Sequence, residues 1–299
     1  MRQAPRTAWV LGVALSACAC GGPPPSQLPS AAAAIERMRA TQACSRGLRA
    51  DAKIDYFGTE GRVRTSALFL AARPESLRFD VLAPSNLGMA LILTTNGERF
   101  ALADNLNTRF ITGPALTCNV ERFTQVPVPP HALVTLLGGE APILVHEPGA
   151  ATLSWNGHLF GGGEYVLELR SKHEATQTVH LTPYPSDWDK PWREQRFEVS
   201  FVRVVQRDYV LYEATLRDYQ AARTAGPLVD PDGLDPDVPP SGPTCSAALP
   251  RSLRIEVPEQ AKDLTMRIQS IEHNPPLLGG SFEQSPAGGM QIERSNCRD

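Results

Sequence analysis

The sequence predicts a mainly β protein with short helices, an α+β chain folded as a strongly curved antiparallel sheet or incomplete barrel. Apolar and polar residues alternate along about ten segments between residues 48 and 272. Most of these segments follow one another through short turns, which join antiparallel strands, whereas parallel strands need longer crossovers. Few helical patterns are available to cover the apolar faces, so the sheet is expected to curve around them.

The chain begins with a targeting segment. Arg2 and Arg6 precede a short apolar run that ends at Ala17, which is typical of a secretory signal peptide over residues 1–17. The run is shorter than the ~20 residues that span a bilayer. The letters LSAC, which end at Cys18, resemble a bacterial lipobox, whose cysteine receives a diacylglycerol. Cys18 is therefore the expected lipid-attachment residue, and secretion without a lipid is the alternative.

The rest of the chain divides into a tether and one domain. Residues 18–31 hold the lipidated cysteine and a flexible stretch rich in glycine, proline and serine. Residues 32–299 are expected to form a single domain, interrupted at 225–244 by an inserted loop rich in proline and aspartate. A domain boundary at this loop is the alternative, but it would leave a very thin second domain.

Charge argues against a nucleic-acid partner. The chain has 29 Lys and Arg against 32 Asp and Glu, a net charge of −3. Without Arg2 and Arg6 the basic residues fall to 27 and the net charge becomes −5. No basic patch in the sequence compensates for this acidic balance.

Cysteine usage predicts disulfide bonds. Export would place the chain in an oxidising compartment, where disulfides persist. Cys20 lies in the tether and is the expected unpaired cysteine. The remaining four allow three pairings, of which Cys44–Cys118 with Cys245–Cys297 is preferred because the second pair encloses the C-terminal segment.

The N-terminal half predicts a helix followed by strands. Apolar residues recur at helical spacing from Ala31 to Met38, so a first helix is expected to end near Gly47. Asn96-Gly97 is the strongest short hairpin signal in the chain. Strands are expected at residues 48–56, 61–72, 76–84, 89–95 and 98–104.

The C-terminal half predicts one more short helix and further strands. Alternation is lost over residues 113–140, where a proline pair opens a short helix that carries Leu133, Leu136 and Leu137 before a Gly-Gly stop. Strands are then expected at residues 151–157, 164–170, 176–182, 194–206, 208–220, 251–257 and 263–272.

No catalytic or metal-binding constellation emerges, so we expect a protein without enzymatic activity and without a metal. The histidines lack metal-ligand spacing, and no nucleophile elbow or phosphate loop occurs. Four aspartates in the inserted loop do not fit a calcium-binding loop and are expected to be solvated. Trp188 and Trp192 could stack on sugars, but loop packing is the commoner reason for such residues.

Three stretches resemble the LolA/LolB-like superfamily of bacterial envelope proteins. Residues 48–88 resemble its opening strands, which end in a loop with the letters SNLG; 124–142 resemble its Pro-x-Pro segment and short helix; and 249–277 resemble its closing strand pair. The resemblance implies an incomplete antiparallel β-barrel with a helical lid and an apolar interior that holds acyl chains. In LolB-type members the loop leucine projects outward and helps to deliver the cargo to the bilayer, which implies this role for Leu87. A leucine folded back onto the sheet is the alternative.

The resemblance also implies a function. It indicates a non-enzymatic outer-membrane lipoprotein that binds lipid or lipoprotein acyl chains on the periplasmic face, with membrane lipid and other lipoproteins or a periplasmic carrier as partners. The covalent acyl lipid on Cys18 is the only cofactor expected, and a monomer is expected. The inserted loop, the cysteines and the tail at 279–299 depart from LolB and indicate a sister family. The alternatives are a structural lipoprotein of an envelope complex and a glycan-binding surface on Trp188 and Trp192.

Overall fold

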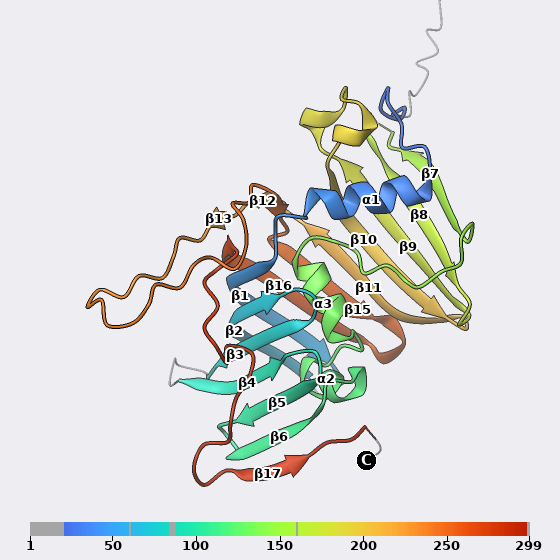
Figure 1. The fold of residues 1–299 in the computed structure, drawn as a ribbon. Helices are drawn as coiled ribbons and strands as arrows, with labels where there is room; N and C mark the ends of the chain where they lie inside the picture. The colour runs from blue at the N-terminus through green and yellow to red at the C-terminus, as the bar shows by residue number, and fades with distance from the viewer. Residues whose placement is uncertain (1–20, 60, 84–87, 160, 298–299) are drawn as a thin grey trace, which may run out of the picture.

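The fold is seen in a computed structural model, which describes residues 21–59, 61–83, 88–159 and 161–297 (Figure 1). The structural statements below concern these residues. Cys18, Cys20 and Leu87 lie outside them, as does the expected signal peptide.

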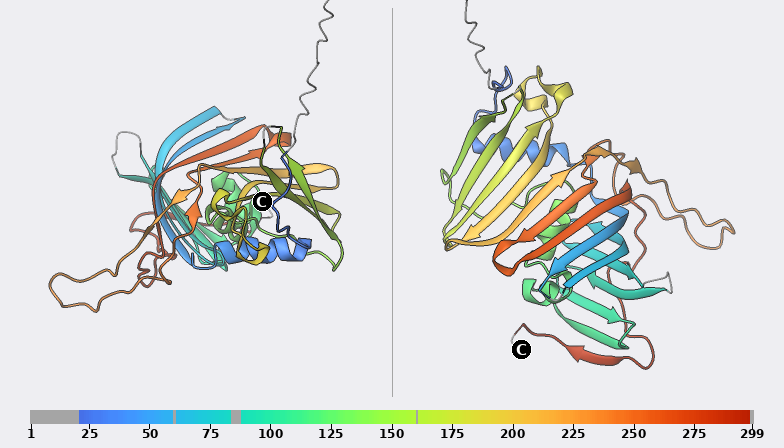
Figure 2. Two further views of the ribbon diagram at one scale, coloured as in Figure 1. Left: turned by 90° about the horizontal axis from the view of Figure 1, so that it is seen from above. Right: turned by 180° about the vertical axis from the view of Figure 1, so that it is seen from behind.

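One large sheet dominates the structure (Figures 1 and 2). Its first strands are β1 (Gly47–Gly58), β2 (Gly61–Ala72), β3 (Ser76–Leu82), β4 (Met89–Thr95), β5 (Arg99–Asp104) and β6 (Arg109–Pro114). A second series contains β7 (Ala151–Gly157), β8 (Gly163–Ser171), β9 (Ala175–Pro183), β10 (Phe197–Gln206) and β11 (Tyr209–Arg217). The closing pair is β15 (Ser252–Val257) and β16 (Lys262–His273). Shorter strands are β12 (Gln220–Ala221), β13 (Arg223–Thr224), β14 (Ala248–Leu249) and β17 (Gln291–Arg294).

The strand order places the closing pair in the middle of the sheet. The order is β17-β6-β5-β4-β3-β2-β1-β16-β15-β11-β10-β9-β8-β7, with β13 also paired to β16. The pairs are antiparallel except for β17 with β6 and β13 with β16. β7 and β17 end the order and do not pair with each other, so the curved sheet stays open (Figure 2). The inserted loop leaves the sheet after β13, and β15 and β16 return to the same sheet.

Three α-helices accompany the sheet: α1 (Ala31–Thr41), α2 (Thr117–Thr124) and α3 (Pro130–Leu137). α1 begins because the Ser30 hydroxyl accepts a hydrogen bond from the Ala33 amide, which caps the first turn. It buries the residues at helical spacing that predicted it. α3 begins at Pro130, since proline is favoured in the first turn of a helix. None of the helices in the described part of the chain is long and apolar enough to cross a bilayer.

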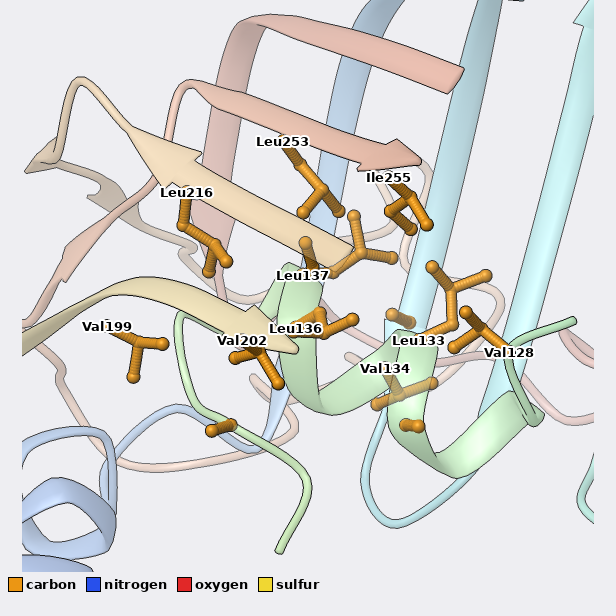
Figure 3. Close-up of a cluster of buried hydrophobic side chains, with 14 of the residues drawn as sticks. Val128, Leu133, Val134, Leu136, Leu137, Val199, Val202, Leu216, Leu253 and Ile255 are labelled. Atoms are coloured by element: carbon orange, nitrogen blue, oxygen red, sulfur yellow. The ribbon is translucent and has the colours of Figure 1, made fainter. Parts of the chain in front are cut away.

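The curved sheet has two arms, one from β7 to β15 and the other from β16 to β5, and α3 lies between them (Figure 1). Its Leu136 and Leu137 are fully buried and point toward residues of β10, β11 and β15 (Figure 3). These partners are Val199, Val202, Leu216, Leu253 and Ile255, all at most 1% exposed. α1 covers β7 and β10 in the same arm. The concave face of the arm from β7 to β15 is therefore covered by a packed core.

Residues 21–30 belong to the folded domain. The Gly21 carbonyl accepts a hydrogen bond from the Trp155 indole at 3.0 Å, and the Leu28 amide donates one to the Tyr165 hydroxyl at 3.2 Å. The Ser26 hydroxyl accepts one from the Trp192 amide, and Leu28 is 6% exposed. The expectation of a flexible tether therefore does not hold for these residues. Their backbone is hydrogen-bonded to two side chains of the sheet, the Trp155 indole and the Tyr165 phenol.

The C-terminal tail covers the other end of the sheet. After β16 it runs across the convex face, where the Gln284 amide donates to the carbonyls of Ile92 and Ala101 at 2.8 Å. β17 then pairs with the edge strand β6. Gly113 permits this approach, because a Cβ on it would lie 2.1 Å from the Ser295 carbonyl oxygen. Neither β6 nor β17 was expected from the pattern of alternation.

The disulfide bonds correct the preferred pairing. All four predicted cysteines are bonded, but Cys44 pairs with Cys245 and Cys118 pairs with Cys297. The preferred pairing is wrong because β16 pairs with β1, which brings the segment before β15 next to the start of β1. The second bond holds the C-terminal tail to α2.

A buried histidine beside this first disulfide predicts a pH-dependent stability. His273 is fully buried; its Nε2 lies 2.9 Å from the Ala247 carbonyl oxygen and its Nδ1 3.0 Å from the Ser45 hydroxyl oxygen. A neutral ring satisfies both contacts, and burial lowers the pKa of His273 below its usual 6.5. The unfolded chain therefore binds a proton at a higher pH than the folded one does.

We expect the free energy of unfolding to fall as the pH drops from 6.5 to this lowered pKa. At still lower pH, His273 should cause no further loss of stability. Denaturant unfolding at a series of pH values measures the effect. His273→Gln keeps a donor and an acceptor, so its profile should be flatter between pH 7 and 5. An unchanged slope in this variant would show that another group controls the acid sensitivity.

Candidate functional site

The concave face of the arm from β16 to β5 carries a row of apolar side chains. Alternation along each strand sends every second residue to this face, and the register aligns them across the strands. Ile54 on β1 is opposite Met266 on β16, and Phe79 on β3 is opposite Leu93 on β4. The row therefore continues across neighbouring strands.

These side chains surround an apolar cavity of about 350 Å³. The volume lies near the lower end of the ~300–1,000 Å³ that ligand pockets occupy. The wall consists of Ile54, Tyr56, Gly61, Val63, Thr65, Phe79, Val81, Leu91, Leu93, Leu102, Thr124, Gln125, Leu133, Leu264 and Met266. None of these residues carries a charge.

Few polar groups interrupt the wall. The Tyr56 hydroxyl lies 3.5 Å from the Gln125 amide oxygen, which joins β1 to the residue that ends α2. The Thr65 hydroxyl donates a hydrogen bond to the Leu82 carbonyl at 2.9 Å. An ionic ligand group buried here would find no charged partner in the wall, whereas an apolar chain loses only water.

The cavity exists because α3 fills only part of the concave face. Leu136 and Leu137 point toward β10, β11 and β15, while Leu133 lies at the other side of the helix and lines the cavity (Figure 3). Thr124 and Gln125 close the same side from the end of α2. Residues of α2 and α3 thus border the cavity on one side. This border is less than the complete helical lid that was expected.

One rim of the cavity is exposed. Val63 faces the concave side of β2 opposite Tyr56, and it is 55% exposed. Phe57 at the tip of the same hairpin is also 55% exposed. Apolar side chains therefore continue from the wall to the surface at the β1–β2 hairpin.

The sequence-predicted site residues fall in different places. Cys18 and Leu87 lie outside the described residues. Ala83 and Gly88, on either side of residues 84–87, are joined by a hydrogen bond of 2.9 Å from the Ala83 amide to the Gly88 carbonyl. Cys44, Cys118, Cys245 and Cys297 are in disulfides and do not line the cavity. Thr124 and Gln125 were not predicted as site residues: α2 was not expected, and its N-cap residue Leu116 gives no side-chain hydrogen bond that would mark the start of a helix.

The tryptophans of the 184–192 loop serve packing. The rings of Trp188 and Trp155 meet edge to face at a centroid distance of 5.8 Å. The Arg193 guanidinium lies over the Trp192 ring, and the Trp192 backbone amide donates a hydrogen bond to the Ser26 hydroxyl. Asp187, which directly precedes Trp188, is fully buried and accepts hydrogen bonds from Lys190 and Arg196. The Arg196 guanidinium holds the pKa of this carboxyl well below its usual range.

The aspartate-rich loop is held by hydrogen bonds between its own residues. Asp230 accepts hydrogen bonds from the amides of Asp232, Leu234 and Asp235. These contacts lower the pKa of Asp230 without any cation. Across the described ranges, no group of three or more His, Cys, Asp or Glu side chains is arranged to hold a metal ion.

Comparisons with known proteins give the fold. No protein-family profile matches the chain, and no functionally curated protein matches it. Among solved structures, a LolA-superfamily protein from Nitrosomonas europaea superposes with a TM-score of 0.50 at 10% identity, over 85% of this chain and 98% of that one. The chain has a LolA-like fold. The expected resemblance to the LolA/LolB-like superfamily is therefore confirmed for the fold.

Other solved structures score slightly lower. A domain assigned by inference to outer-membrane lipoprotein sorting, from Vibrio parahaemolyticus, gives a TM-score of 0.49 at 10% identity, over 85% of this chain and 95% of that one. A DUF1329 family protein from Desulfovibrio piger gives 0.48 at 9% identity, over 83% and 98%. The mainly β, open sheet that the sequence predicts is the architecture of this LolA-like fold.

Proposed function

We propose that this chain binds lipid acyl chains in the apolar cavity and acts, without catalysis, as a lipid-anchored protein of the bacterial envelope. The observation that carries the proposal is the uncharged cavity wall of about 350 Å³ on the concave face. Each methylene group moved from water into such a wall contributes about 0.8 kcal/mol. The LolA-like fold supports the same ligand class.

The proposed anchor is an acyl lipid on Cys18. One acyl chain holds a protein only marginally, and two or three hold it firmly, which matches the lipidation of a lipobox cysteine. The outer membrane, with the domain on the periplasmic side, is the proposed location. Leu87 would touch a bilayer beside the cavity, since in the chain it lies between β3 and β4, whose residues line the wall. Other lipoproteins or a periplasmic carrier are proposed as the sources of the acyl chains.

Photocrosslinking tests the proposal. The full-length protein in phosphatidylcholine nanodiscs is mixed with donor vesicles that contain a phospholipid with a diazirine near the end of one acyl chain. Mass spectrometry of the labelled peptides should place the crosslinks on β1, β4 and β16. Leu91→Trp should fill the cavity, and loss of two methylene positions alone would remove about 1.6 kcal/mol, roughly a tenfold fall in affinity.

A matched control separates cavity filling from damage to the sheet. Leu68 lies on the convex face of β2 and is 40% exposed, so Leu68→Trp adds the same volume outside the cavity. It should leave labelling unchanged. If the wild-type protein shows no labelling of the cavity wall, the proposal fails and the structural role in an envelope complex is favoured.

A further inference from the structure

A second hollow lies on the convex side of the same strands. It has a volume of about 750 Å³ and lies over the outer faces of β1, β2 and β16. Residues that alternate with the cavity wall form its floor: Lys53 is opposite both Ser66 and Arg267, and Asp55 is opposite both Arg64 and Thr265. The two hollows therefore lie back to back on one group of strands.

Cations dominate this convex hollow. Lys53, Arg62, Arg64 and Arg267 line it, against the single carboxylate of Asp55, which leaves a net charge of +3. Asp55 is engaged by Arg62 at 2.7 Å and by Arg64 at 3.1 Å. The Arg62 guanidinium lowers the pKa of Asp55 to about 2, so one negative charge is present at neutral pH.

Two of the cations have no carboxylate partner among the described residues. Lys53 Nζ donates to the Ser66 hydroxyl at 3.1 Å, and no ion pair involves Arg267 in the same part of the chain. Elsewhere on the convex face, Arg49 pairs with Glu272 and Arg254 with Asp263. Within the described residues this hollow therefore carries positive charge that no carboxylate compensates, although the net charge of the chain is −3.

The apolar cavity and the convex hollow meet at one position. Both are lined by Ile54 and Thr65. The pairing of β2 with β3 stops at Ala67 and Val81, so β2 residues 61–66 pair only with β1 in the described ranges. Thr65 donates to Leu82 at this point, and Leu82 also lines the hollow. The edge of β2 therefore separates an apolar interior from a cationic exterior.

We infer that the ligand is an amphiphile with an anionic phosphate headgroup, whose acyl chain enters the apolar cavity beside β2 while its headgroup rests in the convex hollow on Lys53, Arg62, Arg64 and Arg267. This inference rests on the proposed acyl-chain binding and adds the class of headgroup. Three guanidinium groups and one ammonium group supply several donors for phosphate oxygens. The uncharged wall would leave such a headgroup unpaired inside, which favours its position on the convex side.

Two photoreactive lipids with identical acyl chains test the inference. Full-length protein in phosphatidylcholine nanodiscs receives trace amounts of either diazirine phosphatidylglycerol or diazirine phosphatidylcholine from otherwise identical phosphatidylcholine vesicles. Each cation near a lipid surface is worth about fivefold in affinity. The wild-type protein should therefore prefer the anionic probe by at least roughly tenfold in labelling of the cavity wall.

The variant pair sharpens this test. Lys53→Gln with Arg267→Gln should abolish the preference and leave labelling by diazirine phosphatidylcholine unchanged. Arg170→Gln with Lys172→Gln removes the same charge from exposed positions at the end of β8 and should keep the preference. A preserved preference in the first variant, or equal labelling by both probes in the wild type, overturns the headgroup inference alone. Absence of labelling by either probe contradicts the acyl-chain proposal itself.

Two further measurements distinguish other occupants. Calorimetric titration of inorganic phosphate should show no binding in the millimolar range, whereas tighter binding that Lys53→Gln with Arg267→Gln removes would assign the hollow to a free anion. Flotation with vesicles rich in phosphatidylglycerol tests a simple surface contact. If the variant loses flotation while its crosslinking preference stays intact, the hollow contacts a membrane surface and the headgroup inference is wrong.

Discussion

Replacing Cys44 and Cys245 together with serine is expected to lower the free energy of unfolding by about 4 kcal/mol. The bond joins residues separated by 201 positions, so its removal frees a very long loop in the unfolded chain. It also ties the start of β1 to the segment before β14, next to buried His273. Urea unfolding of the oxidised wild type and the double variant measures the difference.

The other disulfide provides the control. Cys118–Cys297 closes a loop of similar separation, 179 positions, but on one side it holds only the tail with β17. Serine at both of these positions should release the tail to limited proteolysis while the rest of the sheet stays protected. If the variant without Cys44–Cys245 unfolds at the wild-type urea concentration, the bond does not contribute to the stability of the sheet.

Leu137→Ala is expected to cost about 3 kcal/mol of stability, within the range for leucine truncations in cores. Leu137 is fully buried and lies where α3 meets β11 and β15 (Figure 3). The neighbouring strands are fixed by their hydrogen bonds, so they cannot close over the space that the side chain leaves. Thermal and urea unfolding of the variant measure the loss.

Leu68→Ala is the matched comparison, since this leucine is 40% exposed on the convex face. Its truncation should cost below about 1 kcal/mol. Similar losses in the two variants would show that α3 does not hold the two arms of the sheet together.

Local patterns predicted the hairpins of this fold well. The Asn96-Gly97 turn forms as expected, because Gly97 has a positive φ of 92° and the Asn96 side chain accepts from the amides of Glu98 and Arg99. Burial alternates along β1 and β3 because one face of each strand is covered, whereas nearly every residue of β5 is buried. β17 could not be predicted in this way: its residues are mostly polar and exposed, and it forms through pairing with β6 and through Cys297.

The functional site was only partly predictable, because it depends on which strands become neighbours. Alternation along residues 76–82 predicts that Leu77, Phe79 and Val81 share one face of β3. It did not show that β16 would return beside β1 and bring Leu264 and Met266 into the wall. The free volume depends on where α3 stops filling the concave face, and no local pattern in the sequence encodes that. The same return of the chain explains why the preferred cysteine pairing failed.

The docked N-terminal segment has a consequence for orientation. Gly21 is hydrogen-bonded beside β7, and at most about 11 Å of extended chain separates it from Cys18. An acyl anchor on Cys18 would therefore hold the β7 edge against its bilayer. Leu87 follows β3 in the chain, and β3 is nine strands away from β7, roughly 40 Å measured along the curved sheet. If both points touch one membrane, the direction of strand order from β7 to β3 must run along the bilayer plane and not away from it.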